Sequence, residues 1–431
     1  MEGDAMKWGS VTLDSLTDAD TPITYGVVKP GEEGDVPFIR GGDIAGGRIL
    51  IGQLRTISRE VSVQYRRTLL RGGEILISLV GNPGQVAIAP PELVGANIAR
   101  QVGLVRLKPN VDPRFVSYFL QSPQGQAAFG AQSLGSVQQV INLRDLKTVK
   151  VPLPPLAEQK RIASILGSLD DKIELNREMN ETLEQMAHTL FKSWFIDFDP
   201  VHAKAAGRQP AGMDKTIADL FPNSFIESET GRIPKGWSMS TIGKELTTIL
   251  GGTPSRAKPE YWTNGTVAWI NSGKANEFRI TDPSEWITQE ALQNSATKLL
   301  PKRTTILAIT GATLGQVSVT EIECCANQSV IGIISSNQFP TEYIYPWVKE
   351  KIGILIASQT GGAQQHVNKG NVEDLPLLCP DLKVVEAYTA AAKPIFNQIA
   401  NNCFQTRTLA TLRDTLLPKL LSGENPLPVK Q

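Results

Sequence analysis

The chain carries an internal repeat with an offset of 226 residues, and this repeat limits the folds open to it. The stretch Gly-Ser-Val-Gln-Gln-Val-Ile-Asn at 135–142 returns as Gly-Gly-Ala-Gln-Gln-His-Val-Asn at 361–368. Three more residue pairs keep the same offset: Ile173 with Ile399, Asn176 with Asn402, and Leu183 with Leu409. A repeat has to be identified first, because two copies of one unit otherwise pass for one large fold. This long period predicts a duplicated domain plus helix, which does one job at two places with a fixed spacing.

Composition narrows the class of protein. A length of 431 residues predicts about two to three domains. The 43 basic and 43 acidic residues balance, so net charge neither requires nor excludes a polyanionic partner. No stretch approaches the ~20 apolar residues that span a membrane, and the first residues lack a signal pattern. Metal-binding spacing is absent among the four cysteines (Cys324, Cys325, Cys379 and Cys403), and we expect a reduced, cytoplasmic protein.

We divide the chain into four parts, at 1–150, 151–198, 199–375 and 376–431. The first part has short β-branched runs, at 74–79 and 102–107, bounded by Gly, Pro and Asn. Such runs predict strands, and a helix is expected over 114–121. The third part begins with a linker over 202–234 that has one short helix near 213–220. It then repeats the pattern of the first part, so we expect two α+β domains.

The second and fourth parts predict two long helices. After a Pro-Leu-Pro-Pro segment at 152–155, apolar residues recur in steps of four and three, which is a heptad seam. A helix over 157–195 would be roughly 55–60 Å long and would act as a spacer. In the fourth part we expect Pro394 to kink or delay the helix and Gly423 to end it. The seam positions are Ile162, Leu166, Leu169, Ile173, Asn176, Asn180, Leu183, Ala187, Leu190 and Trp194, then Ile395, Ile399, Asn402, Leu409, Leu412, Leu416 and Leu420.

The two helices are natural partners for each other's apolar faces. Asn176 and Asn402 occupy the same seam position, where a buried polar residue costs stability but sets the register. The alternative is that each helix packs into an ordinary globular core.

Motifs for catalysis are missing. There is no Gly-x-x-x-x-Gly-Lys-Ser/Thr loop for ATP hydrolysis and no Gly-x-Gly-x-x-Gly after a strand for a dinucleotide or methyl donor. The histidines at 188, 202 and 366 are isolated, which argues against a metal pair. Nothing resembles an Asn-Pro-Pro-Tyr methylation loop. We do not expect catalysis, or a cofactor, in this chain.

Arginine is concentrated in the first domain. Between residues 40 and 71 the sequence has seven arginines and only two acidic residues, Asp43 and Glu60. Arginine prefers bidentate contacts with phosphate or guanine, and phosphate neutralisation drives nucleic-acid affinity. The alternative is an ordinary solvated basic surface. The candidate DNA contacts are Arg40, Arg48, Arg55, Arg59, Arg66 and Arg67, with Arg256, Lys258 and Lys274 among aromatic residues in the second domain.

Amide side chains recur in both copies and can read adenine in the major groove. They can equally hold a loop by bonds to the backbone. Because the element recurs, the shared structural role is favoured, since residues that read different bases should differ between copies. The candidates are Gln85, Gln138 and Gln139, then Asn271, Gln316, Gln364 and Gln365.

Several of these segments together resemble one family. They are Val-Pro-Leu-Pro-Pro-Leu-Ala-Glu-Gln-Lys-Arg-Ile at 151–162, Lys-Ser-Trp-Phe at 192–195 and Ile-Pro-Lys-Gly-Trp at 233–237. Over nearly its whole length the chain is similar to the specificity subunit of type I restriction–modification enzymes. The resemblance implies two target-recognition domains separated by two long helices that form an antiparallel coiled coil, with pseudo-twofold symmetry. The second helix start, at 378–382, lacks the Glu-Gln of the first, which suggests an asymmetric docking surface.

The resemblance also implies a function. Each domain would read one half of a split, asymmetric site in double-stranded DNA, and the helices would set the unread gap. The helices would dock two modification subunits, which carry S-adenosylmethionine and the adenine-methylation site, and restriction/motor subunits would join them. A single-chain methylase or nuclease is argued against by the missing motifs. A coiled-coil scaffold with two protein-binding domains that does not read bases is the remaining alternative.

Overall fold

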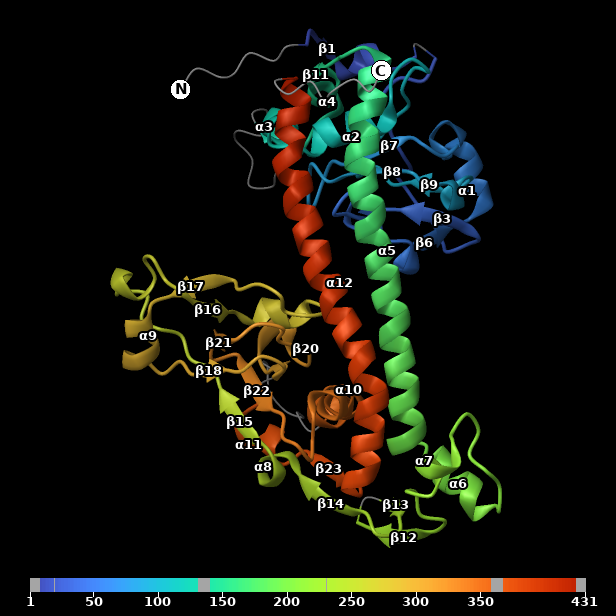
Figure 1. The fold of residues 1–431 in the computed structure, drawn as a ribbon. Coiled ribbons are helices and arrows are strands. Elements are labelled where there is room, and N and C mark those ends of the chain that lie inside the picture. Colours follow the sequence, from blue (N-terminus) through green and yellow to red (C-terminus); the bar gives the residue numbers. More distant parts are fainter. Residues whose placement is uncertain (1–7, 19, 131–139, 230, 358–366, 424–431) are drawn as a thin grey trace, which may run out of the picture. The chain divides into compact units, whose positions relative to one another are not determined.

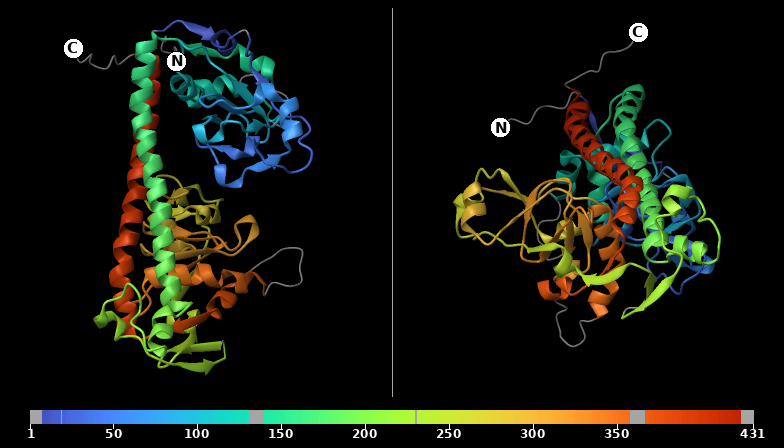
Figure 2. Two further views of the ribbon diagram at one scale, coloured as in Figure 1. Left: turned by 90° about the vertical axis from the view of Figure 1, so that its right-hand side faces the viewer. Right: turned by 60° about the horizontal axis from the view of Figure 1, so that its bottom comes forward.

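Two long helices, α5 (Leu156–Phe195) and α12 (Leu382–Ser422), run through the chain, and each is drawn as one unbroken ribbon in Figures 1 and 2. The structure is a computed structural model that describes residues 8–18, 20–130, 140–229, 231–357 and 367–423. The helix expected over 157–195 is confirmed by α5. Leu153-Pro154-Pro155 precedes it, and proline at these positions keeps the preceding backbone extended.

The expectation that Pro394 delays the second helix is wrong. The helix α12 begins at Leu382 and stays helical through Pro394 to Ser422. An internal proline removes one hydrogen bond and costs about 3 kcal/mol. Burial of Ala392 and Phe396 on both sides of the proline supplies apolar contacts that offset this cost. The helix ends as expected, with Gly423 at a φ of +76°.

Residues 1–173 and 407–431 form a first compact unit, so each unit takes part of both long helices. Its main sheet has the order β2-β10-β7-β8, and a second sheet has the order β6-β3-β9 with β3 and β9 parallel. A short pair, β1-β11, lies beside the start of α5 in sequence. The strands are β1 (Ser10–Thr12), β2 (Thr24–Tyr25), β3 (Val36–Ile39), β4 (Ile44–Ala45), β5 (Arg48–Ile49), β6 (Arg55–Ile57), β7 (Ile75–Ser78), β8 (Val86–Ile88), β9 (Asn97–Ile98), β10 (Val102–Val105) and β11 (Lys150–Pro152), and the short helices are α1 (Arg59–Gln64), α2 (Pro113–Gln121), α3 (Pro123–Gly130) and α4 (Leu143–Thr148).

Residues 174–406 form the second unit, and its topology repeats that of the first. The main sheet has the order β15-β22-β19-β20, the second sheet includes β17-β16-β21 with β16 and β21 parallel, and the short pair is β14-β23. The duplication predicted from the sequence is therefore confirmed for the main sheet, the short pair and three strands of the second sheet. The strand β18 extends the second sheet of the second unit, and the pair β4-β5 belongs to the first unit. The strands are β14 (Ser238–Thr241), β15 (Thr247–Leu250), β16 (Val267–Ile270), β17 (Glu285–Ile287), β18 (Leu299–Leu300), β19 (Thr305–Ala308), β20 (Val317–Val319), β21 (Cys324–Ala326), β22 (Val330–Ile334) and β23 (Pro376–Cys379), and the helices are α8 (Ile242–Glu245), α9 (Gln289–Asn294), α10 (Thr341–Ala357) and α11 (Lys369–Glu373).

The segment expected to be a linker with one short helix is more ordered than predicted. The expected helix is present as α7 (Lys215–Ala218), but α6 (Asp199–Ala205) precedes it and a hairpin of β12 (Phe225–Ser228) and β13 (Gly231–Pro234) follows. The hairpin packs through aromatic rings, with Phe225 against Phe198 and His202. Its composition suggested a linker because glycine and proline are frequent in both turns and linkers.

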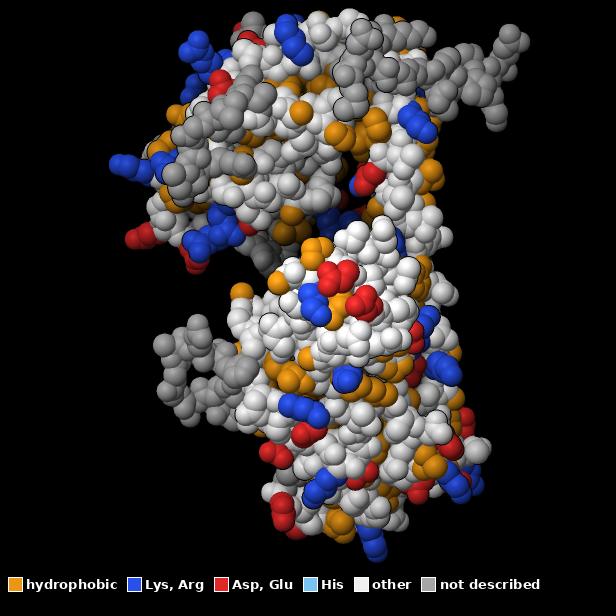
Figure 3. Space-filling view, turned by 90° about the vertical axis from the view of Figure 1, so that its left-hand side faces the viewer, with side chains coloured by type: hydrophobic (Ala, Val, Ile, Leu, Met, Phe, Trp, Pro, Cys, Tyr) orange, Lys and Arg blue, Asp and Glu red, His pale blue; other side chains and the backbone are white. Residues whose placement is uncertain are grey.

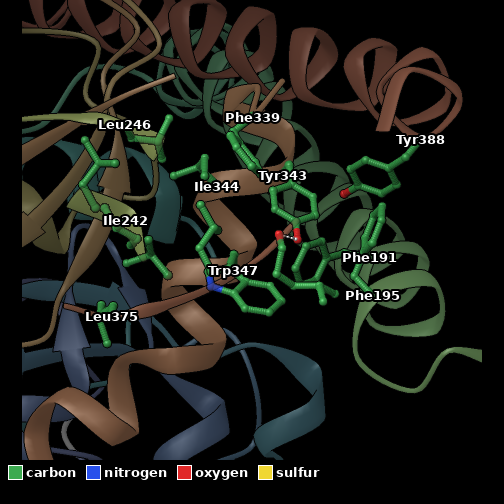
Figure 4. Close-up of a cluster of buried hydrophobic side chains, with 14 of the residues drawn as sticks. Phe191, Phe195, Ile242, Leu246, Phe339, Tyr343, Ile344, Trp347, Leu375 and Tyr388 are labelled. Carbon is green, nitrogen blue, oxygen red and sulfur yellow. Dashed lines mark hydrogen bonds between the residues drawn. The ribbon is translucent and has the colours of Figure 1, made fainter. Parts of the chain in front are cut away.

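Each unit buries an apolar core that includes the long helices. In the first unit Ile162 and Leu166 of α5 and Leu417 of α12 belong to one core. In the second unit the end of α5 contributes Phe191 and Phe195 to an aromatic cluster, which Figure 4 shows facing Tyr343 and Trp347 of α10. Tyr343 donates a hydrogen bond to the carbonyl of Leu378 at 2.8 Å. Ring contacts of this kind add about 0.5–1.5 kcal/mol each beyond the area they bury.

Candidate nucleic-acid interface

The arginines of the first unit differ in how firmly they are held. Arg40 is half-buried and binds Asp43 with two guanidinium contacts, at 3.1 and 2.7 Å. The hydrogen bond to Asp43 raises the pKa of Arg40 above its ordinary value, although burial opposes this. Arg59 forms an exposed ion pair with Asp35 at 2.9 Å, a type that contributes little stability. Arg40 is therefore fixed at a turn, whereas Arg59 can exchange its partner.

Three other arginines are exposed and unpaired. Arg55 lies on β6, and Arg66 and Arg67 lie on the turn after α1. Among the residues that the structure describes, the side chains of these three arginines form no ion pair with an acidic group. Arg48, on β5, is also exposed. The side chains of Arg55, Arg66 and Arg67 can meet a phosphate without first leaving a carboxylate.

The sequence did not reveal which residue holds the turn that bears Arg66 and Arg67. Arg106, which follows β10, donates to the carbonyls of Arg67 and Leu69 at 2.7 and 2.6 Å and to Glu74 at 3.2 Å. Arg106 is thus a structural residue that holds the turn bearing Arg66 and Arg67. No local signal could have found it, because its partners are more than thirty residues away in sequence.

In the second unit, Arg256 is presented on an aromatic surface. Its guanidinium lies 3.5 Å from the centre of the Trp262 ring and makes two contacts with Glu285, at 2.7 and 2.5 Å. This pairing lowers the pKa of the Glu285 carboxyl. Lys258 lies over the Tyr261 ring and bonds its hydroxyl at 3.0 Å. A cation stacked on an aromatic face is partly oriented before any ligand arrives.

Lys274 and Asn271 are engaged within their own loop. Only 14% of the Lys274 side chain is exposed, and its ammonium binds Glu277 at 2.7 Å and Asp282 at 2.9 Å. Burial opposes the charge on Lys274, but the two carboxylates outweigh it and raise the pKa. The Asn271 side chain accepts from the backbone of Gly273 at 2.9 Å. Both geometries fit a structural role at least as well as DNA contact.

The glutamine candidates for base contact differ in whether their side chains are already bound within the protein. The Gln85 side chain accepts from the backbone of Gly46 at 3.3 Å, which is the loop-holding role weighed for it. Gln316 is exposed before β20 and is available to a ligand. The remaining four lie outside the described residues: Gln138, Gln139, Gln364 and Gln365.

The predicted helix seam is internal to the two units. Of the predicted seam positions, the buried ones are Ile162, Leu166, Ile173, Asn176, Ile399 and Asn402, and the half-buried ones are Leu169, Leu183, Leu190, Ile395, Leu409 and Leu416. None of these is exposed. Ile162 and Leu166 belong to the core of the first unit, and Leu190 packs against the core of the second. The structure differs at Leu412, which the heptad series includes but which is 44% exposed.

Within the second unit, α5 and α12 meet through a polar layer. Asn402 donates to Asn180 at 2.9 Å, and Asn176 donates to Gln405 at 2.8 Å. As the number rises along α5 it falls along α12, so the helices are antiparallel. The equivalent residues Asn176 and Asn402 do not bind each other, because an antiparallel pair brings each of them opposite a residue further along.

An exposed apolar stripe on α5 was also missed. Leu175, Met179 and Met186 are 48%, 36% and 54% exposed. Their spacing of four and seven residues places them on one face of the helix. Sequence reasoning looked only for the heptad seam, and these residues lie outside it. We call these three residues the α5 stripe.

On the face of the molecule drawn in Figure 3, basic side chains do not form one continuous patch. Figure 3 shows one face of the molecule, on which Lys and Arg side chains lie among Asp and Glu side chains. Within the part of the chain that the structure describes, no group of His, Cys, Asp and Glu is arranged to hold a metal ion. None of the described helices is long and apolar enough to cross a membrane.

Comparison with known proteins shows which family has this sequence and this fold. Residues 6–185 and 234–393 match the family described as "Type I restriction modification DNA specificity domain". The chain is 24% identical to the type I restriction enzyme HindI specificity subunit of Haemophilus influenzae, over 90% of this chain and 94% of that protein. It is 25% identical to the MjaIX specificity subunit of Methanocaldococcus jannaschii, over 96% and 91%. Its fold resembles the type I restriction-modification S subunit from M. genitalium, with a TM-score of 0.56, 16% identity and 97% of each chain covered.

Proposed function

The chain belongs to the type I restriction modification DNA specificity family, and from this premise we propose how it reads DNA. It is a specificity subunit of a type I restriction-modification system, with two target-recognition domains. We assign to each domain one half of a bipartite, asymmetric DNA sequence. The observation that carries this assignment is the strand order of the main four-stranded sheet, which is the same in both units. A scaffold that does not read bases is not favoured.

Phosphate contacts position a protein on DNA and base contacts specify the sequence. In the first domain we assign phosphate contact to Arg55, Arg66 and Arg67, because they are exposed and unpaired among the described residues. In the second domain we assign it to Arg256, whose stacking on Trp262 orients the guanidinium. Gln316 is our candidate for a base contact, since its amide is exposed at the start of β20.

We further propose that α5 and α12 set the unread gap and dock two modification subunits. A pseudo-twofold chain offers related surfaces to two copies of a partner. The α5 stripe supplies the large apolar side chains that are enriched at interface centres. In this proposal the chain itself is not catalytic. The partners hold S-adenosylmethionine and the adenine-methylation site, restriction/motor subunits complete the cleaving complex, and the assembly works in the cytoplasm.

The test is to co-express the chain with its modification subunit and to map methylated adenines across a genome by single-molecule sequencing. We expect one bipartite motif with a constant gap, which disappears when this chain is deleted. A complex that forms normally but methylates without sequence preference would overturn the proposal and leave the scaffold alternative.

A further inference from the structure

Each recognition domain is attached to α5 by a tyrosine hydroxyl. Tyr118 of α2 and Tyr345 of α10 lie 227 residues apart, one more than the repeat offset of 226, so they occupy neighbouring but not identical positions of the repeat. Tyr118 donates to Asp170 of α5 at 2.6 Å, and Tyr345 donates to Glu184 of α5 at 2.7 Å. At the repeat offset Asp170 corresponds to Phe396 of α12, and the Tyr345 ring does contact the Phe396 ring, with the ring centres 6.1 Å apart. The ring contact therefore follows the repeat, whereas the bond from the Tyr345 hydroxyl to α5 does not.

The second attachment is the more elaborate. The Glu184 carboxylate binds Arg279 at 2.9 Å and Lys349 at 3.1 Å, in addition to Tyr345. The Arg279 side chain is fully buried, and its guanidinium lies 4.6 Å from the centre of the Tyr345 ring. We call these four residues the Glu184 clasp. It joins α5, α10 and the segment after Ser272–Asn276, all within the second unit.

In the first attachment, the cation that binds the carboxylate comes from a long helix and not from the recognition domain. Asp170 binds Arg413 of α12 at 2.8 Å, so carboxylate and cation both belong to the long helices. In the Glu184 clasp the two cations belong to the recognition domain. At the repeat offset, Arg413 corresponds to Ala187 and Glu184 corresponds to Ala410. The ionic part of each attachment is thus absent from the other copy.

Energy alone does not account for the clasp. A buried ion pair has to offset the desolvation of both charges, and apolar replacements are often equally stable. Arg279 also leaves its Nε without an acceptor among the described residues, which adds a cost of about 1–3 kcal/mol. A buried charge pair is, however, directional, because few orientations satisfy both groups. The feature that the clasp supplies beyond stability is a defined orientation.

We propose that Glu184 and Arg279 are positioning residues that fix the tilt of the second recognition domain on α5, and hence the single gap length that the protein accepts. This rests on the proposed function. Without the clasp the domain stays attached at the aromatic cluster around Phe191 and Phe195 and through Arg303, which donates to Asn397 of α12 at 2.6 Å. These contacts hold the domain on the helices and leave it freer to tilt.

The size of the required movement is modest. One more base pair moves a half-site about 3.4 Å along the duplex and turns it by roughly 35°. A domain of about 150 residues has a radius near 15 Å, so a tilt of roughly 10–15° covers the translation. Deformation of the DNA supplies part of the rotation.

The test uses the full chain with its modification subunit and the same methylation mapping. The variant Glu184→Leu with Arg279→Met removes the Glu184–Arg279 pair and leaves only Lys349, whose side chain is 43% exposed, without its carboxylate. We expect unchanged half-sites and an increase of about tenfold, which is about 1.4 kcal/mol, in methylation at sites whose gap is one base pair longer or shorter. Glu184→Gln keeps an acceptor for Tyr345 but leaves the buried Arg279 without its carboxylate. It should give a change in the same direction, and circular dichroism of both variants checks that each is folded.

The control is Thr248→Val, which removes a partly buried hydrogen bond between Thr248 of β15 and Glu373 of α11, inside the same domain. It should lower stability without new gap lengths. Lower methylation at one unchanged gap in both clasp variants would overturn the inference. If the wild-type protein yields no bipartite motif, the proposed function fails instead, so the two failures are distinguishable.

Discussion

At the scale of single residues, the second unit contains a half-buried carboxylate, Glu184, and a buried one, Glu321, whose pKa values move in opposite directions. Burial opposes ionisation of Glu184, but Arg279, Lys349 and Tyr345 outweigh it and lower its pKa from 4.5. For Glu321 burial prevails over Arg303 and the other cations, and the pKa is raised. The difference follows from the contacts, since Glu321 leaves one carboxylate oxygen without a partner among the described residues.

The charge on Glu184 predicts an acid-sensitive attachment. Because its folded pKa lies below the unfolded value of about 4.5, its stabilisation is present above that value and is lost as the pH falls through the folded pKa. Melting temperature measured from pH 7 to pH 3 should therefore fall less steeply below pH 4.5 in Glu184→Gln than in the wild type. Equal slopes for the two proteins would contradict the assignment.

The exposed arginines predict a specific change in DNA binding. Arg66→Gln should weaken binding to specific and non-specific duplexes alike and reduce the salt dependence of the association constant by about one unit. Fluorescence anisotropy between 50 and 200 mM salt checks this. Arg232→Gln, in the hairpin β12–β13, removes an equally exposed charge and serves as the control. A change confined to one sequence would instead indicate a base contact.

At the scale of elements, the polar layer between α5 and α12 trades stability for register. Asn180 and Asn402 bind each other where heptad packing prefers apolar residues. Replacing both by leucine should raise the melting temperature, because the pair no longer has to be desolvated. It should also allow neighbouring registers, visible as two populations in hydrogen exchange over 174–183. A lower melting temperature with one population would show that the layer serves stability.

The α5 stripe predicts a partner interface. Met179→Ser combined with Met186→Ser should leave the free energy of unfolding within about 0.5 kcal/mol of the wild type, as exposed substitutions do. The same variant should weaken association with the modification subunit at least tenfold in a titration by light scattering. Ile226→Ser, at another exposed apolar position, is the matched control. Undiminished association would remove the stripe from the interface.

Regular periodicity made some elements predictable and isolated contacts did not. The seam from Ile162 to Trp194 predicted both ends of α5 to within one residue, because heptad spacing is a property of local sequence. The continuation of α12 through Pro394 was missed, since packing around the proline outweighs its local preference. The partner of Arg279 lies 95 residues away, and no spacing rule links them. For the same reason, charge alone could not separate the engaged Lys274 from the unpaired Arg66.

At the scale of the whole molecule, each unit is assembled from distant parts of the chain. Cleavage at a protease site inserted after Arg208, in an exposed loop, should leave both fragments together. The reason is that the core of the first unit includes Leu417 and that of the second includes Phe195. Size-exclusion chromatography should give one peak until denaturant is added. Separation of the fragments without denaturant would mean that these shared cores are too weak to hold them.

The shared helices also have a consequence for synthesis on the ribosome. The first unit begins at the amino terminus but needs residues from Arg407 onward, whereas the second unit is complete at Thr406. Domains usually fold in the order in which they are translated. Here the unit that is started first is finished last, so Ile162 and Leu166 await Leu417 throughout elongation. The nascent chain therefore exposes apolar core residues of its first unit during most of translation, and a chaperone would be of use in this period.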